Sequence, residues 1–305
     1  MTTIPMPRTT HRAGLAELIS DRCAEITDVR AGSRLQTHRL TICERGSRRA
    51  LFTAVIADRD EATAAVEHEG RMLVELRRGD YGPASLVAPR HVGVAEHIGR
   101  PVLLTSATAG PPLGSAGRRP TRRDVAAVIE WLIAIWDGGR PDSGPTDLGA
   151  TAVDALLTRH SSDADRADVL DRLCVARARV SRARVPRTVS HGALSLDRIT
   201  VARDRVTGVD DWGCGTIAGD PLRDLAAFAV TCAGLRLDFL LKSRRSVAAA
   251  LRAGVRTGLA ALGVDGRLCD EVLLLAVAEQ AAATDEQRRQ AGLQALDAFL
   301  ALTKE

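Results

Sequence analysis

The spacing of apolar residues changes along the chain, and this change constrains the fold more than any other feature of the sequence. In the first third, short runs at 40–43 and 51–56 have the spacing that is typical of strands. Two more strands are predicted at 94–96 and 101–105, and a helix is predicted over 60–76. This part of the chain is therefore expected to form a small sheet with one helix.

The rest of the chain has a helical pattern. After a loop rich in glycine, proline and arginine, an amphipathic helix is predicted over 124–136, and helices then dominate except over 189–215. We therefore expect an α+β protein with two domains: residues 1–105 with strands and one helix, and a larger, helical part over 106–305. A chain of 305 residues is long enough for both.

Lysine and asparagine are nearly absent, and this excludes several kinds of active site. The chain has two lysines, Lys242 and Lys304, and no asparagine. Neither lysine follows a glycine as a P-loop requires, and neither has the setting of a Schiff-base lysine. The six cysteines include no Cys-x-x-Cys pair, which argues against zinc and against a disulfide framework.

The charge and hydropathy of the chain indicate neither nucleic acid nor membrane as a partner. The net charge of +4 is spread along the chain, and only 3% of the residues are aromatic. No apolar run has the length of a membrane span, and the first residues lack the apolar core of a signal peptide. The sequence therefore predicts a cytoplasmic protein, and no pattern in it indicates an oligomeric state.

Three motifs carry most of the functional information. They read His-Gly-Ala-Leu-Ser-Leu-Asp-Arg-Ile over 191–199, Val-Asp-Asp-Trp over 209–212 and Gly-Asp-Pro-Leu-Arg-Asp-Leu over 219–225. This set resembles the catalytic core of the aminoglycoside phosphotransferase and choline kinase-like family. Family members have His-Gly-Asp, an Asn five residues after that Asp, Ile-Asp-Trp and Gly-Asp-Pro-x-x-Asp-Leu. The resemblance implies a bilobal protein-kinase-like fold, with a small sheet lobe and a larger helical lobe.

The resemblance extends to residues of the first domain and implies a nucleotide site there. Gly32 and Ser33 fall where the family has its short nucleotide loop, and Glu69 falls where its first-lobe helix carries a glutamate. Thr105 lies where the family has its hinge. With these positions the resemblance covers nearly the whole chain.

Three catalytic elements of the family are missing together. The lysine of the third strand is absent, because that strand supplies Thr53 and Ala54, so Glu69 lacks its partner unless an arginine reaches it from elsewhere in the small lobe. Ala193 stands at the position of the family's general base and cannot accept a proton. Arg198 stands at the position of the metal-binding Asn, and a guanidinium has no lone pair for a cation.

One metal ligand of the family is kept. Asp211 matches the aspartate of Ile-Asp-Trp, and Asp210 adds a second carboxylate beside it. We expect Asp211 to form an ion pair with Arg198 in place of a metal. The chain therefore resembles a degenerate member of the family, a pseudokinase.

Other residues of the motifs have two interpretations each. Asp197 is either a substitute base or a turn residue before the next strand, and His191 is either catalytic or bonds the backbone of its own loop. Of the two scaffold aspartates in the third motif, Asp220 is expected to support the loop and Asp224 to cap or brace the helix that follows.

Two function classes follow. The first is a catalytically impaired scaffold that binds a small molecule, a peptide or a partner enzyme in the cleft between the lobes, in specialised metabolism. The second is an atypical ATP-dependent phosphotransferase that uses Asp211 for a metal and acts on a hydroxyl of a small molecule or peptide; adenylyl transfer is a third, less favoured reaction. ATP and Mg²⁺ are the cofactors that the resemblance implies. The sequence alone assures the binding of neither, because the family's lysine and metal-binding asparagine are missing.

Overall fold

The structure is a computed structural model that describes residues 24–31, 37–46, 50–79, 81–115, 117–137, 142–234, 236, 246–283 and 286–303. These residues fall into two compact units. The small unit takes the described residues up to Ala109 together with Gly208–Gly215. The large unit takes Gly110–Thr207 and the described residues from Thr216 onward. The segment with Asp210 and Asp211 therefore packs with the sheet.

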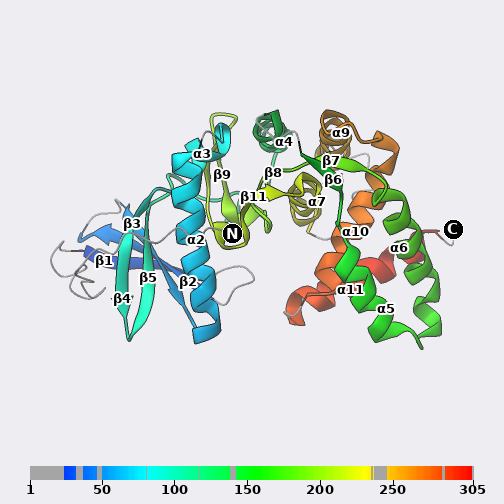
Figure 1. The fold of residues 1–305 in the computed structure, drawn as a ribbon, viewed down its shortest axis with the longest axis horizontal. Coiled ribbons are helices and arrows are strands. Elements are labelled where there is room, and N and C mark those ends of the chain that lie inside the picture. Colours follow the sequence, from blue (N-terminus) through cyan, green and yellow to red (C-terminus); the bar gives the residue numbers. More distant parts are fainter. Residues whose placement is uncertain are drawn as a thin grey trace. The chain divides into compact units, whose positions relative to one another are not determined.

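The small unit is a five-stranded antiparallel sheet with a long helix. The strands follow the order β1-β2-β3-β5-β4. In Figure 1, α2 runs beside this sheet, and among the strands it contacts mainly β3 and β5. The elements are β1 (Ala24–Ala31), β2 (Thr37–Glu44), β3 (Ala50–Ala57), α2 (Asp60–Arg78), α3 (Pro83–Val87), β4 (His91–His97) and β5 (Arg100–Ser106).

Apolar alternation explains the core of this sheet. Phe52 and Ala54, two residues apart on β3, pack with Ile42 of β2 and with Val102 and Leu104 of β5. The predicted strands and the helix are confirmed. The apolar pattern over 60–76 predicts Ala64, Met72 and Leu73 as buried positions; Met72 and Leu73 are buried, whereas Ala64 is exposed.

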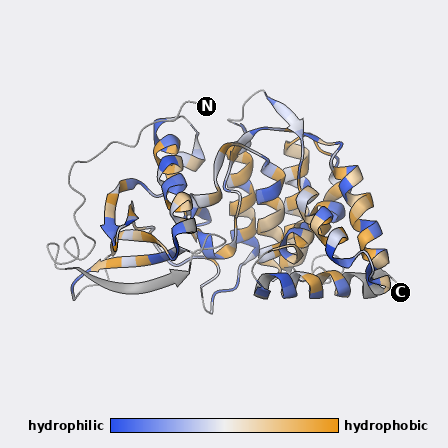
Figure 2. Ribbon diagram, turned by 60° about the horizontal axis from the view of Figure 1, so that its bottom comes forward, coloured by the Kyte–Doolittle hydropathy of each residue, from blue (hydrophilic) through white to orange (hydrophobic). Residues whose placement is uncertain are grey.

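The large unit is mainly helical. Its central helix α10 contacts α5, α6, α7 and α11 and is apolar on nearly all sides, as expected of a helix surrounded by others. Figure 2 shows apolar residues concentrated in the helices of this unit. The helices are α4 (Arg122–Asp137), α5 (Ala150–His160), α6 (Ala167–Val180), α7 (Pro221–Cys232), α9 (Ser246–Ala261), α10 (Cys269–Ala281) and α11 (Glu286–Thr303).

Short strands and turns hold the motif residues. Two of the strand pairs are β8 with β11 and β9 with β10, and they occupy the stretch that the sequence predicted as an exception among helices. The strands are β6 (Ser143–Pro145), β7 (Arg184–Pro186), β8 (Thr188–Ser190), β9 (Ile199–Ala202), β10 (Arg205–Val209) and β11 (Thr216–Gly219), and the 3-10 turns are η1 (Ala164–Arg166), η2 (Leu196–Arg198), η3 (Trp212–Cys214) and η4 (Gly266–Leu268). Among the described helices, none has the length and apolarity needed to cross a membrane.

Candidate functional site

A buried arginine of the small unit takes the place of the missing lysine. Arg39 lies on β2, directly opposite Val55 of β3, and its Nη2 donates to both carboxylate oxygens of Glu69, at 2.7 and 2.6 Å. The side chains of Arg39 and Glu69 are 6% and 3% exposed. The arginine that the sequence left as an open alternative is therefore Arg39, supplied by the neighbouring strand.

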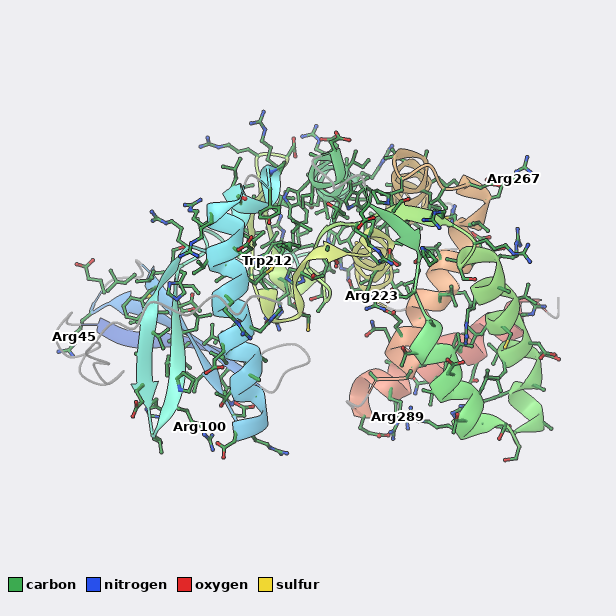
Figure 3. All side chains as sticks on the ribbon, viewed as in Figure 1. Arg45, Arg100, Trp212, Arg223, Arg267 and Arg289 are labelled. Carbon is green, nitrogen blue, oxygen red and sulfur yellow. The ribbon has the colours of Figure 1, made fainter. Side chains whose placement is uncertain are left out.

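The same guanidinium nitrogen also holds Asp211. Nη2 of Arg39 donates to Oδ1 of Asp211 at 2.9 Å, and Asp211 is 2% exposed. The backbone N–H of Trp212 donates to Oε1 of Glu69 at 3.2 Å, and Trp212 lies beside α2 (Figure 3). We refer to Arg39, Glu69 and Asp211 as the Arg39 cluster. The predicted pair between Asp211 and Arg198 would join the two units and stays a prediction.

Charge and burial compete in the Arg39 cluster. Burial raises the pKa of the Glu69 carboxyl above its ordinary value, and the charge of Arg39 opposes that rise. Burial alone would lower the pKa of Arg39, but the charges of Glu69 and Asp211 outweigh it and raise that pKa. The pKa of Arg39 therefore lies above its ordinary value, and its guanidinium is charged at neutral pH.

Asp210 and Thr105, the other predicted small-unit residues that the structure describes, each contact a threonine. Asp210 accepts a hydrogen bond from the hydroxyl of Thr108, which the sequence analysis did not single out. Thr105 is buried at the end of β5, and its hydroxyl donates to the carbonyl of Thr53 at 3.5 Å, a long contact. The predicted loop residues Gly32 and Ser33 lie outside the described residues.

Asp211 has a left-handed backbone conformation, with φ of 70°. Asp and Asn tolerate this region, whereas other residues with a β-carbon pay about 1–2 kcal/mol. Asp211→Ala is therefore expected to lower the free energy of unfolding by about 1–2 kcal/mol more than Asp211→Asn does. Urea unfolding of both variants measures this difference, and equal losses would contradict the backbone argument.

In the large unit, a buried aspartate organises the loop that carries Ala193. Asp224 of α7 accepts hydrogen bonds from the Ser190 hydroxyl at 2.9 Å and from the backbone N–H groups of His191 and Gly192, at 2.6 and 2.8 Å. Burial raises the pKa of the Asp224 carboxyl, while the neighbouring His191 and the three donors oppose that rise. The ring of His191 is itself buried, and its Nδ1 accepts from the backbone N–H of Ala193 at 3.3 Å.

The two scaffold aspartates have exchanged the roles that the sequence predicted. Asp220, expected to support the loop, caps α7 instead, because its Oδ1 accepts from the backbone N–H of Leu222 at 3.0 Å. Its Oδ2 accepts from the Thr146 hydroxyl and from the backbone N–H of Asp147. Asp224, expected to cap the helix, supports the loop. The prediction was wrong because a motif gives the spacing of side chains but not their directions.

The positions of the lost base and the lost metal ligand are both buried. Ala193 presents a methyl group, and Arg198, in η2, is buried as a charged side chain. Asp197, next to Arg198, is exposed, and Oδ1 of Asp197 lies so close to Gly114 that a side chain at position 114 would collide with it. Within the described ranges, no group of three or more His, Cys, Asp and Glu side chains has the arrangement of a metal site.

Comparisons with known proteins show which solved structures have a similar fold. No protein-family model matches this chain, and no curated protein matches its sequence. Solved structures do match. A thermostable mutant of aminoglycoside phosphotransferase APH(4)-Ia is 15% identical with a TM-score of 0.58, covering 92% of this chain and 94% of that one. Macrolide 2'-phosphotransferase type I is 18% identical with a TM-score of 0.59, covering 96% and 98%.

A third structure, macrolide 2'-phosphotransferase MphH from Brachybacterium faecium, is 16% identical with a TM-score of 0.56, covering 92% of this chain and 97% of that one. The three likenesses span nearly the full length of each chain at low sequence identity. They agree with the small antiparallel sheet unit and the larger helical unit. The chain thus has the protein-kinase-like fold of the aminoglycoside and macrolide phosphotransferases.

Proposed function

We propose that this protein is a pseudokinase, a phosphotransferase-fold protein that binds a small molecule, a peptide or a partner enzyme without transferring phosphate. The observation that carries the proposal is the hydrogen bond from Arg39 to Asp211. Asp211 is the one metal ligand that the resemblance retains, and a guanidinium already occupies it. Ala193 and Arg198 support the same conclusion, because neither can act as a base or as a metal ligand.

Magnesium does not fit the residues present. Mg²⁺ requires oxygen ligands in near-octahedral geometry, with one or two carboxylates from the protein. Asp211 is engaged by Arg39, Asp210 accepts from Thr108, and Arg198 brings a positive charge to the position of the family's Asn. We therefore derive no phosphoryl-transfer step for this chain.

A nucleotide remains the first ligand to test. Two crystal structures of mutants of aminoglycoside phosphotransferase APH(4)-Ia, which has a similar fold, are ternary complexes with hygromycin B, one with ADP and the other with AMP-PNP. For this chain we propose Gly32, Ser33, Glu69 and Thr105 as nucleotide-site residues.

A second candidate function is an atypical phosphotransferase. It is favoured by one observation, that Glu69 has a cationic partner in Arg39 as it would have in a lysine-containing relative. This function requires Asp211 to exchange Arg39 for a metal and requires a base other than Ala193, for which Asp197 is the candidate. The two functions differ in their dependence on Mg²⁺.

We expect ATP to raise the unfolding temperature of the full chain as much in EDTA as in Mg²⁺, and we expect no ATP to be consumed. A ligand at about 100 times its dissociation constant stabilises by about 2.7 kcal/mol, which thermal unfolding detects readily. ATP consumption that requires Mg²⁺ and is lost in Asp211→Asn would overturn the pseudokinase. The Asp197→Ala variant then tests the substitute base. If no nucleotide stabilises the chain, nucleotide binding is excluded, and the scaffold for a peptide or a partner enzyme is the function that remains.

A further inference from the structure

Helices α4 and α9 lie side by side in the large unit (Figure 1), and a groove of about 600 Å³ runs between them at the surface. The two helices approach closely, because α9 has Gly254 at a point where a β-carbon would lie 2.8 Å from Cγ1 of Ile129. The apolar lining comes from Val125, Ile129 and Ile133 of α4 and from Ala250 and Ala253 of α9. An apolar groove at the surface of a chain is the kind of feature that a partner covers.

Two charges of opposite sign line this groove on the same face of α4. Arg122 and Glu130 are both exposed, and the exposed Ala126 lies midway between them, four residues from each. Neither Arg122 nor Glu130 has an ion pair or a hydrogen bond among the residues that the structure describes. Within α4, no residue of opposite charge lies three or four positions from either of them. Arg123 also lines the groove and pairs with Asp204 at 3.7 Å. The groove therefore offers a partner one cation and one anion that the chain leaves unpaired.

We propose that this groove is the interface of a symmetric dimer, in which α4 of a second copy lies antiparallel to α4 and crosses it at Ala126. A two-fold axis at Ala126 places Arg122 opposite the partner's Glu130 and Glu130 opposite the partner's Arg122, because both lie four residues from the axis. A two-fold interface must be self-complementary in this way. Any other protein would have to supply an anion and a cation about 12 Å apart along one helix, and α4 itself has that spacing.

The other residues of the groove fit the same arrangement. Ala126 has a short side chain, so two copies of α4 can approach closely where they cross. Ile133 is only partly buried and Ala253 is exposed in one copy, and a helix in the groove covers both. Arg122 lies in the first turn of α4, where the helix dipole disfavours a cation, and the partner's Glu130 offsets that charge. The apolar contacts supply affinity, and the two ion pairs set the orientation.

Sedimentation of the full chain over a range of concentrations tests the dimer. Arg122→Glu and Glu130→Arg each place like charges opposite one another in both pairs, so each is expected to raise the dissociation constant by about tenfold or more. The double variant Arg122→Glu/Glu130→Arg exchanges the two charges and is expected to dimerise as the natural chain does. The two single variants, mixed in equal amounts, are expected to form a heterodimer, because every pair between them is then of opposite charge. Arg159→Glu is the matched control, an exposed arginine on α5, and is expected to leave the dissociation constant unchanged.

A natural chain that sediments as a monomer at every concentration would overturn the proposal and leave the groove to a different protein. A dimer that persists in both single variants would place the interface on another face, and a mixture of the single variants that stays monomeric would refute the pairing. Ala126→Cys checks the crossing point, since a two-fold axis at residue 126 brings the two cysteines together, and oxidation is expected to link two chains that the natural chain, with its own six cysteines, leaves unlinked. No readout involves ATP, so failure of this inference and failure of the pseudokinase proposal are separable.

Discussion

Replacing Arg39 by methionine is expected to lower the free energy of unfolding by about 3–5 kcal/mol, because removing one partner of a buried ion pair leaves uncompensated charge. Arg39→Met leaves two carboxylates, Glu69 and Asp211, buried without their cation. Methionine is unbranched and replaces the aliphatic stem of arginine without its guanidinium, so the loss reports mainly the missing charge and its hydrogen bonds.

Hydrogen exchange of the amides in β2 and α2, measured by mass spectrometry, locates the effect in the small unit. Arg100→Met is the matched control (Arg100 is labelled in Figure 3). Arg100 pairs with Asp60 on the surface, with side chains 37% and 86% exposed, and its loss is expected to cost less than about 1 kcal/mol. Equal exchange in the Arg39→Met variant and the natural chain would contradict the assignment.

Moving the positive charge to the neighbouring strand tests whether the stability of the cluster requires arginine itself or only a cation that faces the carboxylates. Val55 is fully buried and lies directly opposite Arg39 in the register of β2 and β3. The double variant Arg39→Val/Val55→Lys moves the positive charge to the third strand, where the family carries its lysine. It is expected to recover part of the stability that Arg39→Met loses. Arg39→Val alone is the reference.

Replacing Asp224 by alanine is the second large expected effect, a loss of about 3–5 kcal/mol in the large unit. The variant leaves the backbone N–H groups of His191 and Gly192 without their acceptor inside the protein. Each buried donor that loses its partner costs about 1–3 kcal/mol. The Ser190 hydroxyl loses its acceptor as well.

Urea unfolding of Asp224→Ala and of a control, Asp197→Ala, measures this effect. Asp197 belongs to the motif over 191–199, whose loop Asp224 contacts, but it is exposed, so its replacement is expected to change stability by less than about 0.5 kcal/mol. If the two variants unfold at the same urea concentration, Asp224 does not organise the loop. Because Ala193 is not a base, the role of Asp224 in this chain is expected to be conformational.

Local patterns in the sequence were sufficient to predict the secondary structure and the class of fold. The strand at 51–56 lies in β3, and the helix at 124–136 lies in α4, because alternation and helical periodicity are set by neighbours in the chain. The motif spacing also led to the prediction that Ala193 and Arg198 replace a base and a metal ligand. Loss of a chemical group can be recognised from the residue type alone.

The partner of Glu69 could not be identified in the same way. Arg39 is thirty positions from Glu69, and the contact depends on the register of β2 with β3 and on how α2 packs against the sheet. A one-residue slip in that register would turn Arg39 to the other face. The exchanged roles of Asp220 and Asp224 have a similar origin, since both lie in one motif and only the folded backbone gives their directions.

The sequence by itself determined the order of the elements, the kinase-like motifs and the absence of a lysine, a base and an asparagine from their positions. Only the tertiary structure decided that Arg39 supplies the missing cation and that the same cation occupies Asp211. The physical reason is that composition and periodicity act over a few residues, whereas charge compensation in a buried site depends on which distant side chains the packing brings within hydrogen-bond distance.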